Sequence, residues 1–199
     1  MNLLDKKRSS SWLSILPLKD QGFNLNKGDF RDALNLQYRW QMKNVPHHCK
    51  CGKAFSTGHA MIYPFGGLPI VRHNEVRDIT VQWLTEACAD AEKRTTAAII
   101  TSRWNNTNAH RQQVDARLDI RAQGLWGWQQ DAFSNIRVFH PNTSSYRSTN
   151  ILALFRQHEM AKKREYGDRI REVEYAVLTP LVFSTTAGMG NIATVSYKA

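Results

Sequence analysis

Hydrophobic residues recur every three or four positions in three segments of the chain, which predicts three amphipathic helices. The first covers residues 28–42, and the second, which has the clearest pattern, covers residues 72–93. The third covers residues 151–174, and its second half carries a dense mixture of acidic and basic side chains. The apolar face of the second helix consists of Val76, Ile79, Trp83, Leu84, Ala87 and Cys88. Asn74 is a candidate cap for this helix.

Alternation of polar and apolar residues predicts β-strands in the rest of the chain. The predicted strands are residues 97–100, 115–122, 134–141 and 179–186. In the second of them Leu118 and Ile120 lie on one face and Asp119 on the other. The intervening GLWGWQ suits a hairpin, in which we expect Trp126 and Trp128 to pack over the sheet in preference to stacking on bases. The order of elements predicts an α/β sandwich with a mixed sheet flanked by helices.

The charge of the chain adds an expectation about its partner. The 199 residues carry a formal net charge of +10, with 42% hydrophobic residues, which indicates a folded basic protein. Such an excess favours a polyanionic partner, either nucleic acid or an anionic membrane surface; a basic enzyme without such a partner is the alternative. No segment approaches the roughly 20 apolar residues of a membrane span. Three cysteines, two of them closely spaced, favour a reducing compartment, the nucleus or cytoplasm.

Two groups of residues carry potential chemistry. Residues 47–64 (HHCKCGKAFSTGHAMIYP) supply Cys49, Cys51 and His59, three side chains of the kinds that zinc prefers, whereas structural zinc normally takes four. On the predicted sheet, a phosphodiester-cutting site would need carboxylates that hold a divalent cation. Asp119 is one such acid, and the neighbouring strand carries Asn135 with Arg137 two residues later.

The motifs HCKCG, GHA, RHNEVRD, ARLDI, NIRVFHP, HEMAKKREY and TPLVFSTTAGMG occur in this order along the chain. This succession resembles the C-terminal endonuclease region of site-specific non-LTR retrotransposon proteins, from about Trp12 to the end of the chain. That region is similar to restriction enzymes of the PD-(D/E)xK class, follows a reverse transcriptase domain and includes a zinc knuckle. The resemblance implies three parts. They are an N-terminal helical segment (1–46), a degenerate knuckle (47–66) and a restriction-endonuclease-like domain (67–199).

The resemblance implies a metal-dependent endonuclease that nicks target DNA with Mg²⁺ or Mn²⁺, and RNA is a further possible partner. The first strand acid of the family corresponds to Asp119, and the second corresponds to Asn135, followed by Arg137. A Lys–x–x–x–Tyr pair on the next helix corresponds to Lys162 and Tyr166, which are one helical turn apart.

The helix that follows the knuckle supplies the remaining residues that the resemblance implies. Glu75 would assist Asp119 in holding Mg²⁺. Arg72, His73 and Arg77 would lie near the nucleic-acid backbone.

Two positions depart from the family pattern. Asn135 replaces an acid, and because an amide offers a dipole instead of a full charge, Mg²⁺ binding should weaken severely; Glu75 or Asp115 could partly compensate. Tyr63 stands where the family has the fourth zinc ligand. The loop could then bind zinc with water or His48 as the fourth ligand, or bind no metal. The chain is therefore expected to be an endonuclease, a non-catalytic nucleic-acid-binding remnant of one, or, less favoured, a basic scaffold.

Overall fold

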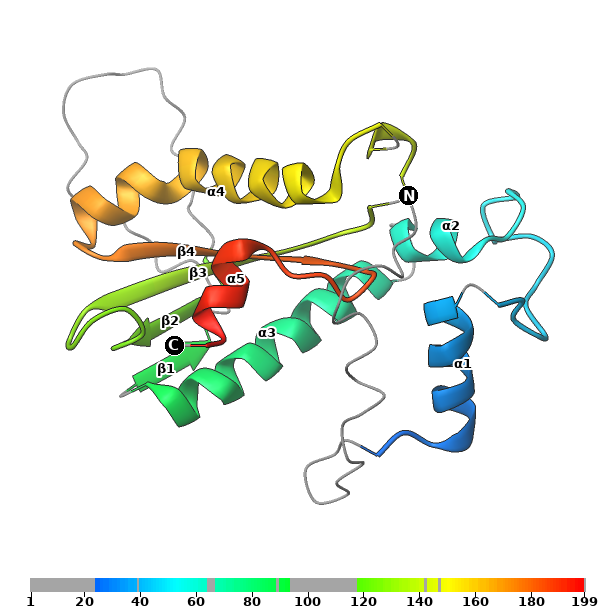
Figure 1. Ribbon diagram of the computed structural model, residues 1–199, viewed down its shortest axis with the longest axis horizontal. Coiled ribbons are helices and arrows are strands. Elements are labelled where there is room, and N and C mark those ends of the chain that lie inside the picture. Colours follow the sequence, from blue (N-terminus) through cyan, green and yellow to red (C-terminus); the bar gives the residue numbers. More distant parts are fainter. Residues whose placement is uncertain are drawn as a thin grey trace.

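The computed structural model describes residues 24–38, 40–63, 67–88, 90–93, 118–141, 143–146 and 148–198. Within these ranges a four-stranded mixed sheet lies between helices, as predicted (Figure 1). The strands are β1 (Asp90–Lys93), β2 (Ile120–Gln123), β3 (Asp131–Phe139) and β4 (Val177–Ser184). The strand predicted at residues 97–100, and Asp115, lie outside the described residues.

The order of the strands in the sheet follows their order in the chain. β1 pairs with β2, and β2 with β3, in antiparallel fashion, whereas β3 and β4 are parallel. A parallel pair needs a long crossover connection, and the helix between the two strands provides it. In the register of the sheet Ile120 lies opposite Ser134, and Asn135 lies opposite Pro180.

The helices are α1 (Lys27–Tyr38), α2 (Thr57–Ile62), α3 (Leu68–Ala87), α4 (Ile151–Val173) and α5 (Asn191–Ser196), with a 3₁₀ turn at Ser144–Tyr146. α4 begins where its pattern predicted, because the Asn150 side chain accepts the backbone N–H of Leu152 at 2.8 Å. None of the described helices is both long enough and apolar enough to cross a membrane.

The boundaries predicted for the second helix were wrong at both ends. α3 begins at Leu68, six residues before the predicted cap Asn74, which therefore lies inside the helix. The observed N-cap is Gly67, in a left-handed conformation with φ 76°. A proline in the first turn favours this earlier start, because the missing N–H is not needed there. The last four residues of the predicted helix form β1 instead.

Each face of the sheet carries its own hydrophobic core. The core beneath α3 and α5 includes Leu84, Ile120, Ile136, Leu181 and Ala193. The opposite face packs against α4 in two clusters, whose buried members are Leu118, Phe133, Tyr166, Ile170, Ala176, Phe139, Ile151, Leu154, Phe155 and Val182. The alternation predicted for β3 is confirmed, since Ile136 and Phe139 lie in cores on opposite faces.

Two predictions about the packing of apolar residues were wrong. Leu118 and Ile120 lie in different cores, because the regular strand begins only at Ile120 and the chain bends at Asp119. Ile79 is 63% exposed, and the neighbouring Thr80 is buried in its place. The Thr80 hydroxyl lies 2.6 Å from the Val76 carbonyl and 2.7 Å from the Tyr197 hydroxyl, so both polar groups are satisfied inside the core.

The hairpin between β2 and β3 forms as predicted. The Gly124 N–H donates to the Gln130 carbonyl at 3.0 Å, and Gly124 adopts a φ of 96° that favours glycine. Trp126 packs over the sheet and donates its indole N–H to Thr179 of β4 at 2.7 Å. Trp128 is 91% exposed, so the prediction that it packs was wrong.

Candidate functional site

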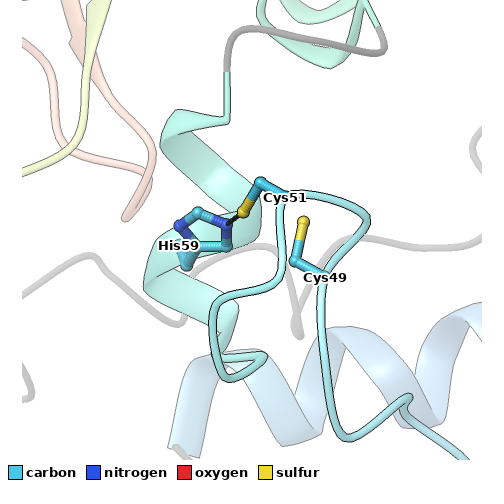
Figure 2. A group of neighbouring side chains, drawn as sticks. All are labelled: Cys49, Cys51 and His59. Atoms are coloured by element: carbon cyan, nitrogen blue, oxygen red, sulfur yellow. Dashed lines mark hydrogen bonds between the residues drawn. The ribbon is translucent and has the colours of Figure 1, made fainter.

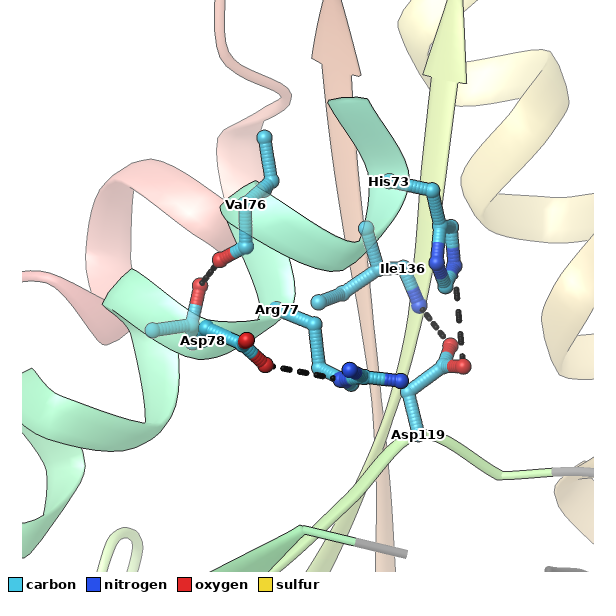
Figure 3. A network of polar contacts seen from close by, with 7 residues as sticks. His73, Val76, Arg77, Asp78, Asp119 and Ile136 are labelled. Carbon is cyan, nitrogen blue, oxygen red and sulfur yellow. Dashed lines mark hydrogen bonds and ion pairs between the residues drawn. The ribbon is translucent and has the colours of Figure 1, made fainter. Parts of the chain in front are cut away.

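Asp119 connects the start of β2 to the middle of β3 (Figure 3). Its backbone N–H donates to the Ser134 carbonyl at 3.0 Å, and its carboxylate Oδ2 accepts the Ile136 N–H at 2.7 Å. The regular pairing of β2 with β3 ends at Ile120. Beyond that point the Asp119 carboxylate, in place of a backbone carbonyl, accepts the N–H of Ile136. Because these two bonds lie on either side of Asn135, Asp119 and Asn135 are neighbours on adjacent strands.

His73 of α3 lies over the other oxygen of the same carboxylate. Its Nε2 is 3.5 Å from Asp119 Oδ1, and the histidine and aspartate side chains are 31% and 11% exposed. The hydrogen bond to Asp119 raises the pKa of His73, although partial burial acts in the opposite direction. Both carboxylate oxygens of Asp119 are therefore engaged by protein groups, and Figure 3 shows the two contacts converging on it.

Asn135 and Arg137 belong to the face of β3 that packs against α4, since they alternate with Ile136. Asn135 is buried and Arg137 is exposed. The position to which the resemblance assigns a second acid thus holds an amide inside the protein, with a guanidinium two residues further on at the surface.

Lys162 and Tyr166 lie one turn apart on α4, facing this part of the sheet. Lys162 Nζ is 2.9 Å from Glu165 Oε2 and 5.0 Å from the centre of the Tyr166 ring. Burial, followed by the neighbouring Glu165 and Asp119, raises the pKa of Tyr166 to about 12, so its hydroxyl keeps its proton at neutral pH. Tyr166 and Asp119 are thus electrostatic neighbours, and the Lys162 charge is already paired with a carboxylate.

Three basic side chains form what we call the basic patch: Arg137, His158 and Lys162. Burial, and then the charges of Arg137 and Lys162, lower the pKa of His158. The His158 ring is held by the Tyr146 hydroxyl at 3.3 Å and by the Phe139 ring, whose centre is 4.6 Å away. The predicted site did not include His158, because its proximity to Arg137 depends on the register of β3 against α4.

The remaining predicted site residues lie on α3, at different positions around the helix. Arg72 Nη1 donates to the Met61 carbonyl of α2 at 3.3 Å, and burial lowers its pKa. Arg77 pairs with Asp78 at 3.0 Å, and its side chain extends towards Asp119 in Figure 3. Glu75 is exposed and lies about 200° around the helix from His73, so the structure does not bring it to Asp119.

Cys49, Cys51 and His59 form a compact group that could hold a metal ion (Figure 2). Their ligand atoms all lie within 4.8 Å of one another, and Cys51 Sγ is 3.3 Å from His59 Nε2. In the described part of the chain this is the one group of three or more His, Cys, Asp or Glu side chains with such spacing, so neither His48 nor Asp119 belongs to one.

Local backbone geometry explains why these three side chains meet. Both cysteines belong to a turn of residues 49–52, in which the Gly52 N–H donates to the Cys49 carbonyl at 2.9 Å and Gly52 has a φ of 81°. The Ser56 side chain then caps α2 by accepting the His59 N–H at 3.1 Å. The cap fixes the direction of the helix and so aims His59 at the cysteine turn.

A scan of the chain against protein-family models found no matching family. A search of curated proteins found no matching relative either.

Proposed function

We propose that this chain is a non-cutting nucleic-acid-binding domain, built on a restriction-endonuclease-like framework and derived from a retroelement reverse transcriptase protein. It would comprise the three parts expected from the resemblance and act on DNA in the nucleus or cytoplasm. The mixed sheet between helices and the adjacency of Asp119 and Asn135 support this framework. The observation that carries the proposal is the state of Asp119, whose neighbour is an amide and whose two oxygens are engaged by Ile136 and His73.

The ligands that Mg²⁺ prefers disfavour cleavage at Asp119. This ion binds anionic oxygens in an octahedral arrangement and is commonly held by one or two carboxylates together with substrate phosphates. Asp119 would have to exchange a contact with His73 for the ion, and Asn135 offers a carbonyl dipole in place of a second charge. Glu75 does not compensate, because it lies on the other side of α3.

The charge of the chain favours nucleic-acid binding. The chain has a net charge of +10, and the basic patch lies beside the Asp119–Asn135 junction. Basic side chains that contact phosphates release bound counterions, which provides affinity that falls as salt rises. Arg137 is exposed and is therefore the member of the patch best placed to meet a phosphate.

A second candidate function is active, metal-dependent cleavage. The positions of four residues favour it. Asp119 lies near both Asn135 and Tyr166, and Lys162 lies over the Tyr166 ring. In that case Asp119 and the substrate phosphate would hold Mg²⁺ or Mn²⁺, and Lys162 would act near the scissile phosphate.

Nicking of supercoiled plasmid separates the two functions. We expect no nicking by the native protein in Mg²⁺ or Mn²⁺, and we expect Asn135→Asp to gain activity, because a second carboxylate restores anionic charge beside Asp119. Asp119→Ala and the double variant serve as inactive controls. Nicking by the native protein that Asp119→Ala abolishes would establish the enzyme and overturn the proposal.

Salt-dependent DNA binding tests the other half of the proposal. The logarithm of affinity should fall linearly with the logarithm of salt concentration, and Arg137→Gln should reduce the slope by about 1. Arg171→Gln, at an exposed position on the same helix as Lys162 but near its far end, is the matched control. An absence of binding at low salt would leave only the basic scaffold.

We also propose that the metal ion of the Cys49–Cys51–His59 group is Zn²⁺. Two thiolates and an imidazole are ligands that this ion prefers, and their ligand atoms all lie within 4.8 Å of one another, close enough to surround one ion. Elemental analysis of the purified protein should find about one zinc per chain.

A further inference from the structure

We propose that the hydroxyl of Tyr63 is the fourth ligand of this zinc site, which makes a coordination sphere of two sulfurs, one nitrogen and one phenolate oxygen. The inference rests on the proposed zinc site and is independent of whether the domain binds or cuts nucleic acid. It also assigns a role to the residue that departs from the knuckle pattern.

The position of Tyr63 carries the argument. It follows α2 directly as its C-cap, one helical turn after His59, so the two side chains leave the helix on the same side. Their ring centres are 5.3 Å apart, with an angle of 48° between the ring planes. Burial, and then the neighbouring thiols of Cys49 and Cys51, raise the pKa of the Tyr63 hydroxyl. The phenol oxygen therefore lies beside a proposed ligand sulfur.

The distances also suit coordination. Zinc bonds of about 2.3 Å to sulfur and about 2.0–2.1 Å to nitrogen or oxygen, at tetrahedral angles, place neighbouring ligand atoms roughly 3.5 Å apart. Cys51 Sγ and His59 Nε2 are 3.3 Å apart, close to that value before any ion is added.

The alternatives for the fourth position are weaker. His48 does not belong to the compact group, although it precedes Cys49 directly. A water molecule would have to compete with a phenol that is tethered one turn from His59, and tethering reduces the entropy lost on coordination.

Binding must release the protons of the ligands. Zn²⁺ replaces the thiol protons of both cysteines and the phenol proton of Tyr63, while His59 binds as the neutral ring. The site then carries a net charge of −1. With Phe at position 63 and water as the fourth ligand, only the two thiol protons are displaced and the net charge is zero.

Calorimetric titration of the metal-free full-length chain with Zn²⁺, in buffers of different ionisation enthalpy, counts these protons. We expect the native protein to release about one more proton than Tyr63→Phe when it binds Zn²⁺. We also expect Tyr63→Phe to bind Zn²⁺ roughly 10–100-fold more weakly, the loss typical for removal of a group that supports a metal site. A tyrosinate difference band in the ultraviolet spectrum should accompany binding and disappear in Tyr63→Phe. Tyr175→Phe, at an 86% exposed position, is the control and should retain the band.

Tyr63→Cys provides a rescue, since a third thiolate should restore or exceed the native affinity if position 63 faces the ion. His48→Ala should change neither proton release nor affinity. Equal proton release and affinity for the native protein and Tyr63→Phe would overturn the proposal, and so would an absence of zinc binding by the native protein. Plasmid nicking and DNA binding, measured separately, report on the proposed function and not on this ligand.

Discussion

A single carboxylate joins three elements at the centre of the candidate site. Asp119 precedes β2, accepts a backbone N–H of β3 and contacts His73 of α3. A buried carboxylate satisfied in this way stabilises the fold, whether or not it ever holds a cation. The residue to which the sequence resemblance assigns a role in chemistry therefore has a structural function in this chain, which does not depend on the amide at position 135.

The contact between His73 and Asp119 should make stability depend on pH. The pKa of His73 is raised in the folded protein, so its contribution is fully present below the unfolded value and is lost as pH rises through the folded pKa. His73→Ala should therefore lower the free energy of unfolding more at about pH 5.5 than at about pH 8.5. Urea denaturation at the two pH values measures the difference.

His140→Ala is the informative control for this experiment. Burial, and then the charge of Arg72, lower the pKa of His140, so protonation of this ring opposes folding at low pH. Its substitution should show the reverse trend with pH. An equal loss of stability at both pH values for His73→Ala would contradict the prediction.

At the scale of elements, α5 is fixed to the body by a buried acid on α4. The Glu159 carboxylate is 7% exposed and accepts the Ile192 N–H, in the first turn of α5, at 3.1 Å. The chain enters α5 through Gly190, where an added Cβ would overlap the same carboxylate. Because that carboxylate is buried and already bonded, it has little room to move.

Gly190→Ala should therefore destabilise the protein by about 1–3 kcal/mol, the typical cost of overpacking. Gly167→Ala is the matched control, since Gly167 lies inside α4 and an added Cβ would meet no neighbour within 4 Å. This second change should stabilise the protein by about 0.5–1 kcal/mol, because alanine is the better helix former. Thermal or urea unfolding of both variants measures these effects; a neutral Gly190→Ala would contradict the proposed clash.

The attachment of α2 depends on one side chain of the next helix. Arg72 holds the Met61 carbonyl at 3.3 Å and lies 3.7 Å from the Met61 sulfur, while no residue of α2 is buried. Arg72→Leu should increase hydrogen exchange of the α2 amides and leave those of α4 unchanged. Arg156→Leu, at an exposed position on α4, should alter neither. Unchanged exchange in α2 would show that other contacts hold it.

The elements that the sequence predicts well are those with a strong repeating pattern. Nine-residue β3 and 23-residue α4 have unambiguous alternation or helical spacing, and Asn150 marks the start of the helix. α5 has six residues, too few for a repeat, and its position depends on the distant Glu159. β1 was assigned to a helix because its Asp-Ala-Glu-Lys sequence has helical propensity, which pairing with β2 overrides.

In the candidate site, too, the sequence predicts some contacts and not others. Sequence resemblance predicted that Asp119 and Asn135 belong together, and their neighbouring strands place them so. It assigned His73 and Arg72 to a nucleic-acid backbone, whereas His73 contacts Asp119 and Arg72 contacts Met61. Those contacts depend on how α3 is rotated against the sheet, a property that no local motif encodes.

For the whole molecule, the separation between the metal group and the two cores has a measurable consequence. The cores draw their buried residues from α3, α4, α5, the strands and the segments next to them, and α2 contributes none. Removing zinc with a chelator should therefore leave the urea midpoint of the α/β body unchanged. It should also expose residues 48–63 to proteases. A large shift of the midpoint on chelation would contradict this separation.

Both edges of the described sheet are closed to a further strand. β1 has four residues, three of them charged, and short charged strands pair poorly with another chain. On β4, Pro180 has no N–H to offer, and the carbonyl of Val182 already accepts the N–H of Gly190 at 2.8 Å. Even at high concentration, copies of this domain should not join edge to edge into fibrils, and a binding partner must recognise side chains in place of extending the sheet.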